Sequence, residues 1–285
     1  MSAPKFGPGG NSESFYAEGF KSSSDAPAWV RARGLDAYEY QAGNGLTAGE
    51  AALSRVGDAA AEQGIAMSLP APYFLSLSGT DPVKRLKSLD YIKKSVRAAE
   101  LLRADTIVIH SGSAAKISRE EAMSLARDTL ERTADAVGDT KIHLGLETMG
   151  KINQLGTLDE VIELCRTAPC FYPVVDFGHL NSREGGGLFP DADSYRRVFD
   201  KIAQGLGDEY ARTLHCHFSM IEYTSAGEKR HLTFSDGGDF GPHFEPLAEA
   251  IVREDLSPRI ICESAGTMAE DALCMKDMWW RLLHQ

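Results

Sequence analysis

The sequence contains no hydrophobic run long enough to cross a membrane. A membrane helix needs about 20 consecutive apolar residues, and every apolar stretch here is interrupted well before that length. The first ten residues, Met1 to Gly10, also lack the apolar core of a secretory signal peptide. We therefore expect a cytoplasmic protein without a membrane partner.

Cysteine is scarce and its spacing carries no motif. There are five cysteines, an odd number, and no two of them are spaced Cys-x-x-Cys: Cys165, Cys170, Cys216, Cys262 and Cys274. This pattern excludes a disulfide framework and a thiolate zinc ribbon. We expect reduced thiols, most of them in the core.

Positive charge is in deficit. Lysine and arginine number 30 against 41 aspartates and glutamates, so the formal net charge is −11. Broad attraction to nucleic acid comes from cations that neutralise phosphates, and this composition argues against it. A site that holds phosphate locally, through metal ions and a few basic loops, is still compatible with an acidic surface.

The composition is that of a globular protein, with 43% hydrophobic and 25% charged residues. Short apolar runs alternate with longer amphipathic stretches along the whole chain. The runs predict eight strands, at Lys5–Gly7, Leu35–Tyr40, Ile65–Leu69, Thr106–Ile109, Ile142–Glu147, Tyr172–Asp176, Thr213–Phe218 and Arg259–Glu263. The amphipathic stretches predict helices at Ala26–Arg33, Ala48–Gln63, Asp81–Arg103, Arg119–Val137, Leu158–Arg166, Asp191–Leu206, Phe244–Arg253 and Met268–Leu283, with Thr47 and Ser118 as N-caps.

Eight β-then-α units with right-handed crossovers close most economically into a (β/α)8 TIM barrel, an α/β fold. We therefore predict that residues 1–285 form a single barrel domain. An open, doubly wound sheet is the alternative. Its dinucleotide-binding version loses support because Gly7-Pro8-Gly9-Gly10, after the first strand, lacks the Gly-x-Gly-x-x-Gly spacing.

Histidines and carboxylates gather where the predicted strands end, which in a barrel is the functional face. These residues are His110, Glu147, Asp176, His179, His217 and Glu263, with His231 in the long loop after the seventh strand. Carboxylates that converge on one barrel mouth repel one another unless a cation lies between them. Imidazoles and carboxylates without cysteine favour zinc, manganese or iron over calcium.

Strand alternation sorts the remaining histidines. His215 and His217 share a face of the seventh strand, with His217 nearer the top. We predict His217 as a ligand and leave His215 open between a supporting and a packed role. His143 and His284 are predicted to be structural.

At these positions the sequence resembles the endonuclease IV family of apurinic/apyrimidinic endonucleases, within the xylose-isomerase-like barrels. The resemblance spans Leu35 to the C-terminus and rests on Ile109-His110-Ser111-Gly112-Ser113, Leu146-Glu147-Thr148, Val175-Asp176-Phe177-Gly178-His179, His217-Phe218-Ser219, Arg230-His231 and Cys262-Glu263-Ser264.

The resemblance implies a centre of one to three zinc ions, with manganese as an alternative metal. Glu147 would bridge two ions, with His110 on the first ion, Asp176, His217 and Glu263 on the second, and His179 and His231 on the third. Tyr73 and Phe74 would push into the DNA, and Lys229 and Arg230 are predicted to contact phosphate.

Two departures from the family pattern stand at ligand positions. Pro70 replaces a histidine of the first metal, and Lys229 replaces an aspartate of the third. Glu228 could substitute for that aspartate only if the loop is shifted. The ligands of the second ion are intact, so one tightly held ion is the safer expectation.

These observations predict a monomeric, metal-dependent endonuclease that cuts damaged double-stranded DNA 5′ to abasic sites, with Glu147 and Glu263 as catalytic residues. Two alternatives stay open. A sugar isomerase or epimerase would use one divalent ion, with Glu147 and Glu263 as paired acid and base. A non-catalytic barrel would bind damaged DNA without cutting it.

Overall fold

Eight parallel strands form the centre of the molecule in a computed structural model that describes residues 3–42, 45–236 and 238–285. The strands are β1 (Lys5–Pro8), β2 (Ala37–Glu39), β3 (Ala66–Pro70), β4 (Thr106–His110), β5 (His143–Glu147), β6 (Phe171–Asp176), β7 (His215–Phe218) and β10 (Arg259–Cys262). They pair in the order β1-β10-β7-β6-β5-β4-β3-β2. The predicted parallel α/β architecture is confirmed, and each predicted strand is present within two residues of its expected bounds.

The two outermost strands of this order, β1 and β2, lie beside each other and close the barrel. A parallel bridge joins Gly9 to Glu39, and the Asp36 amide donates to the Phe6 carbonyl at 2.8 Å. The approach is so close that a Cβ atom on Gly7 would lie 1.8 Å from the Ala37 carbonyl oxygen. Only glycine fits at this closure of the barrel.

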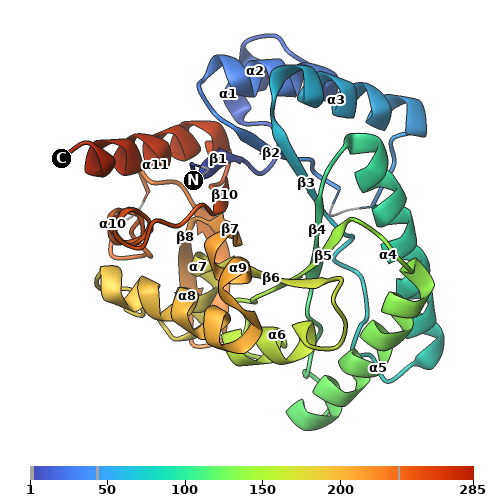
Figure 1. The fold of residues 1–285 in the computed structure, drawn as a ribbon. Coiled ribbons are helices and arrows are strands. Elements are labelled where there is room, and N and C mark those ends of the chain that lie inside the picture. The colour runs from blue at the N-terminus through green and yellow to red at the C-terminus, as the bar shows by residue number, and fades with distance from the viewer. Residues whose placement is uncertain (1–2, 43–44, 237) are drawn as a thin grey trace.

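Helices surround the strands in a ring (Figure 1). Their bounds are α1 (Glu13–Ala17), η1 (Ser23–Asp25), α2 (Ala26–Ala32), α3 (Glu50–Gln63), α4 (Pro82–Leu102), α5 (Arg119–Val137), α6 (Leu158–Cys165), α7 (Phe177–Arg183), α8 (Ala192–Leu206), α9 (Asp208–Arg212), α10 (Glu245–Arg253) and α11 (Met268–Leu283). None of these helices is long and apolar enough to span a membrane. Ser118 caps α5 as predicted, whereas the prediction for Thr47 is wrong because Gly49 is the N-cap of α3.

The long segment after β7 is not a simple loop. It folds into an antiparallel hairpin of β8 (Met220–Thr224) and β9 (Gly227–Leu232), so His231, which we expected in a loop, lies on a strand. The sequence hides this hairpin because β9 is mostly polar and alternates poorly. A backbone bridge between Lys151 and Gly227 attaches the hairpin to the segment after β5.

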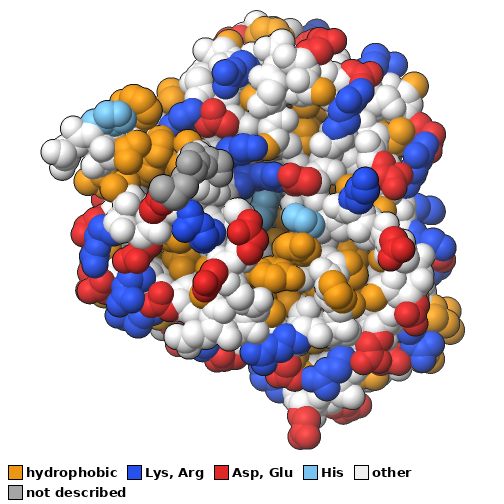
Figure 2. Space-filling model, viewed as in Figure 1, with side chains coloured by type: hydrophobic (Ala, Val, Ile, Leu, Met, Phe, Trp, Pro, Cys, Tyr) orange, Lys and Arg blue, Asp and Glu red, His pale blue; other side chains and the backbone are white. Residues whose placement is uncertain are grey.

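The end of the barrel at the amino ends of the strands is occupied by structural contacts. Figure 2, which views the molecule from the side of the N-terminus, shows histidine, basic and acidic side chains around a small hollow. Here the Arg259 guanidinium donates to both oxygens of Asp105, and the His143 ring stacks on Tyr172 with 3.7 Å between ring centres. His143 therefore has the packed position that we predicted, and the opposite end of the barrel is left for chemistry.

Candidate metal centre

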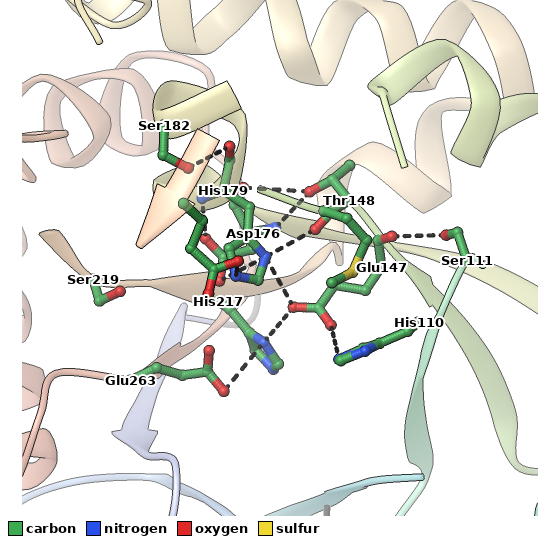
Figure 3. Close-up of polar contacts among 12 residues, drawn as sticks. His110, Ser111, Glu147, Thr148, Asp176, His179, Ser182, His217, Ser219 and Glu263 are labelled. Atoms are coloured by element: carbon green, nitrogen blue, oxygen red, sulfur yellow. Dashed lines mark hydrogen bonds and ion pairs between the residues drawn. The ribbon is translucent and has the colours of Figure 1, made fainter. Parts of the chain in front are cut away.

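Parallel register brings four of the predicted ligands together at the carboxyl ends of neighbouring strands. His110 at the end of β4 pairs with Glu147 at the end of β5, and Asp176 at the end of β6 pairs with His217 on β7. Glu263 follows β10 directly. Figure 3 shows these side chains pointing into one space at the barrel mouth.

A central group consists of Glu147, Asp176, His217 and Glu263, whose ligand atoms all lie within 4.8 Å of one another. The Nδ1 atom of His217 lies 3.0 Å from Oε1 of Glu147 and 3.6 Å from Oε1 of Glu263. Glu147, Asp176 and His217 are buried, and Glu263 is partly exposed at the mouth. The structure thus assembles the three residues that the resemblance assigns to the second ion, together with Glu147, the predicted bridging residue.

The two oxygens of Glu147 face in different directions. Oε1 faces His217 and His179, the latter at 3.6 Å from Nδ1, whereas Oε2 lies 3.5 Å from Nε2 of His110. This geometry suits a carboxylate that contacts two cations. His110 has only Glu147 as an ion-pair partner within the described part of the chain, in keeping with proline rather than histidine at position 70.

Asp176 is oriented by the start of α7, which sequence analysis did not predict. As the N-cap of α7, it accepts the His179 amide at 2.7 Å through Oδ1. Its other oxygen, Oδ2, is buried and accepts no hydrogen bond from any described residue. A buried carboxylate oxygen without a donor is destabilising, and this one lies in the central group.

A second group lies beside the first and consists of His179, Glu228 and His231. The Nδ1–H of His179 can donate to the Thr148 carbonyl at 3.0 Å, which leaves Nε2 facing Oε2 of Glu228 at 3.5 Å. Oε1 of Glu228 lies 4.0 Å from Nε2 of His231. The predicted ligands His179 and His231 therefore converge, and Glu228 lies where the missing aspartate was expected.

A register irregularity in the hairpin turns Glu228 inward. The β8–β9 pairing shifts between Glu222 and Tyr223, so that Tyr223 pairs with Glu228 and Glu222 with Arg230. Lys229 has no partner in this ladder and its side chain points outward, where it pairs with Glu222. This is the loop shift that we required for Glu228 to substitute as a ligand.

Sequence analysis missed Glu39 altogether. It ends β2, is fully buried, and lies below the central group, between His217 and His215. A glutamate between Tyr38 and Tyr40 in an otherwise apolar strand was a usable signal, because an isolated carboxylate at a strand end needs a partner. His284, by contrast, lies at the C-terminal cap of α11, and its side chain interacts with the Trp280 carbonyl and ring.

The electrostatics of the centre call for additional positive charge. Burial alone lowers the pKa of His179 and His217, yet the surrounding carboxylates outweigh it and raise the pKa of His179 to about 9 and that of His217 well above its usual value. Burial similarly raises the pKa of Glu147, but the three neighbouring histidines lower it to about 2. Burial dominates at Glu263 and raises its pKa.

These residues fit a divalent cation. The protons on His179 and His217 partly neutralise the carboxylates where a metal ion would do so more completely. The donor set of imidazoles and carboxylates, with the unsatisfied Asp176 oxygen, matches zinc or manganese rather than calcium.

The four residues predicted to contact DNA lie around the same mouth. The two aromatic residues and the two basic residues differ in their neighbours. Tyr73 and Phe74 are each 53% exposed, and the Tyr73 ring stacks against His110. Lys229 and Arg230 are exposed on β9, but both pair with the Glu222 carboxylate, which offsets much of their charge. The two aromatic side chains are therefore about half exposed, and the basic character of the hairpin is reduced.

A polar pocket opens beside the centre. Its volume is about 560 Å³, and Glu263 and His231 form part of its wall. The rest of the wall is uncharged and includes Tyr16, Tyr38, Tyr40, Asn11 and Gln41. The pocket is large enough for a single sugar or nucleotide unit.

The sequence matches the family described as xylose isomerase-like TIM barrel over residues 27–278. The chain belongs to this family. The match covers all the residues of the two candidate ligand groups, and the family accounts for the fold that carries them. The predicted resemblance is confirmed at this level.

Two relatives are similar in sequence to this xylose isomerase-like barrel. An uncharacterized protein of Methanocaldococcus jannaschii is 29% identical over 74% of the chain and 76% of its own length. A probable endonuclease 4 of Acholeplasma laidlawii is also 29% identical, over 59% of the chain and 57% of its own length. The chain thus aligns with little more than half of that endonuclease.

Solved structures of similar fold include both an endonuclease and an epimerase. Endonuclease IV from Thermus thermophilus has a TM-score of 0.64 at 17% identity, covering 91% of this chain and 94% of its own. D-Psicose 3-epimerase from Clostridium cellulolyticum has a TM-score of 0.65 at 13% identity, covering 91% and 94%. At these identities the similarity shows the fold alone.

Proposed function

We propose that this protein is a metal-dependent phosphodiester hydrolase that cuts damaged double-stranded DNA 5′ to abasic sites. The observation that carries the proposal is the second ligand group, His179, Glu228 and His231, next to the central group. The sugar isomerase or epimerase considered above uses one divalent ion, whereas adjacent ions act together in phosphatases and nucleases. The similarity to probable endonucleases 4 supports the same activity.

Each residue then has a role in the site. The ions, when bound, would supply Lewis acidity to the phosphodiester and acidify a water molecule. Glu147 would contact two ions, and Glu263, which forms part of the pocket wall, would hold the central ion beside the substrate. Tyr73 and Phe74, exposed at the mouth, would contact the DNA near the gap.

The test is cleavage of a duplex that carries one abasic site, compared with an undamaged duplex. The purified protein is supplied with zinc, manganese or a chelator. A Glu147→Gln variant, which removes the charge of the bridging carboxylate but keeps the size of the side chain, is tested in parallel. We expect nicking of the damaged strand only, its loss with the chelator, and its loss in the variant while the circular dichroism spectrum stays unchanged. Absence of nicking with every metal would refute the proposal.

A sugar isomerase or epimerase is the second candidate, favoured by the uncharged wall of the pocket. Tyrosine, asparagine and glutamine side chains suit sugar hydroxyls, and no lysine or arginine lines the pocket within the described residues. The same protein preparations should therefore be incubated with a panel of ketoses and aldoses. Metal-dependent conversion of a sugar, without nicking, would replace the hydrolase proposal.

A further inference from the structure

Glu39 contacts the edge of the His217 ring that faces away from the central group. Its Oε1 and Oε2 atoms lie 3.1 Å and 3.3 Å from Nε2 of His217. The other ring nitrogen, Nδ1, faces Glu147 and Glu263. The imidazole thus lies between Glu39 and the other carboxylates, and its ring separates Glu39 from the position of a central ion.

The position of Glu39 determines which nitrogen of His217 carries a proton. An ionised carboxylate only accepts hydrogen bonds, so Nε2 must donate to it. In the neutral imidazole this leaves the lone pair on Nδ1, directed at the central group. Histidine ligands generally have their second nitrogen held in this way, and the partner orients the ring and raises its basicity.

Glu39 is itself held rigidly. Ser68, on the neighbouring strand β3, donates its hydroxyl to Oε2 at 2.9 Å, and Nε2 of His215 lies 3.3 Å from the same oxygen. Glu39 is fully buried, and no lysine or arginine of the described chain pairs with it. A buried charge is costly unless it is paired, and within the described chain the rings of His215 and His217 are the ion-pair partners of Glu39.

We propose that Glu39 is the positioning residue for the metal ligand His217: by accepting the Nε2–H hydrogen bond it fixes the ring so that Nδ1 binds the central ion. The inference rests on the proposed metal centre but not on the identity of the substrate. It gives Ser68 a supporting role, because its hydroxyl donates to Glu39, and His215 lies beside the same carboxylate oxygen.

The test measures metal affinity rather than turnover. Zinc or manganese is titrated calorimetrically into the chelator-stripped full chain of the wild type and of Glu39→Gln. Because loss of such a partner weakens metal binding by about 10- to 100-fold, we expect that decrease for the central ion, with the number of bound ions unchanged. Glu160→Gln is the matched control, because Glu160 is a buried carboxylate that contacts none of the ligands. Its affinity should equal that of the wild type.

A second readout reports the tautomer directly. In the zinc-loaded wild type, nitrogen-15 spectra of labelled histidines should show the His217 ring protonated at Nε2 and bound to the ion through Nδ1, and the Nε2 signal should shift in Glu39→Gln because a neutral amide oxygen is a weaker acceptor than a carboxylate. If Glu39→Gln does not fold, Ser68→Ala replaces it, with a smaller loss of affinity in the same direction.

The remaining outcomes overturn the inference in distinguishable ways. Equal affinity in the wild type and Glu39→Gln would refute it while leaving the metal centre standing. Loss of one whole ion, with the others unaffected, would make Glu39 a ligand in its own right. A wild-type protein that binds no metal would refute both this inference and the proposed function.

Discussion

Glu228 shows how a single side chain can restore a site that the sequence suggests is incomplete. It lies one position before Lys229, and the shifted pairing of β8 and β9 places its carboxylate between His179 and His231. Its side chain is 16% exposed, whereas that of Lys229 is 55% exposed. The carboxylate of the second group is therefore one residue away from the position at which the resemblance predicts it.

Replacement of Glu228 by glutamine should weaken one bound ion selectively. The variant loses the only carboxylate of the second group, so we expect at least about a tenfold weaker affinity for that ion and little change for the central one. Calorimetric titration with zinc measures both. Glu222→Gln, on the same hairpin but paired with Lys229 and Arg230, is the control and should bind like the wild type. Identical isotherms for the two variants would exclude Glu228 as a ligand.

Glu160 provides a pH-dependent contribution to stability. Burial raises its pKa, but the Arg119 guanidinium and the amides of Gly156 and Thr157 outweigh this and lower it. The lowered pKa means that the stabilisation is fully present above the unfolded pKa of about 4.3 and is lost as the pH falls through the folded value. Glu160→Gln should lower the free energy of unfolding in urea by about 1 to 3 kcal/mol at pH 7, and by less as the pH falls below 4.

The matched control for this pH dependence is Glu163→Gln. Glu163 lies on the same helix, pairs with Arg127, and is 52% exposed. Surface pairs contribute little, so its effect should be small at every pH. A difference between Glu160→Gln and the wild type that stays constant down to pH 3 would contradict the assignment.

At the scale of residues, the sequence predicted those candidate ligands that follow directly from strand ends. His110, Glu147, Asp176 and Glu263 end or follow successive strands, and parallel register then brings them together. Glu39 also ends a strand but was missed, and Glu228 lies at no strand end. The position of Glu39 depends on closure between β1 and β2, and that of Glu228 on a bulge, and neither leaves a periodic signal in the sequence.

At the scale of elements, the β8–β9 hairpin lies outside the eight-stranded sheet of the barrel but carries two of the candidate ligands. It supplies Glu228 and His231, and its tip is attached through Gly227, whose φ is +91°. The Glu228 amide donates to the Gly150 carbonyl at 3.1 Å. The position of the second group thus depends on how the hairpin rests on the segment after β5.

Gly227→Ala should displace this hairpin while the barrel stays folded. A Cβ atom there would lie 2.1 Å from the Gly150 carbonyl oxygen, so backbone must move apart. We expect loss of the ion held by the second group, retention of the central ion, and faster amide exchange in β8 and β9. Gly185→Ala controls for backbone strain, since Gly185 also has a positive φ, +76°, but no atom within 4 Å. If the two variants bind metal equally, the hairpin does not position the second group.

At the scale of the whole molecule, the barrel concentrates negative charge at its mouth on a chain that is already acidic, with a net charge of −11. Glu39, Glu147, Asp176, Glu228 and Glu263 all lie within the two groups or directly below them. Without a cation, the histidines between them must carry the compensating protons, as the raised pKa values of His179 and His217 indicate. Folding and metal binding should therefore be coupled.

Removal of metal by a chelator should lower the melting temperature of the whole protein. An ion present at 100 times its dissociation constant stabilises the folded state by about 2.7 kcal/mol. For a chain of this size each kcal/mol shifts the melting temperature by roughly 2 to 4 °C, so we expect a decrease of about 5 to 10 °C by differential scanning calorimetry, reversed by added zinc or manganese. In Glu147→Gln the chelator should have much less effect, because the bridging carboxylate is gone. A wild-type protein that melts at the same temperature with and without chelator, despite binding metal, would show that the barrel mouth is held in place by its own hydrogen bonds, and that its carboxylates do not depend on a cation.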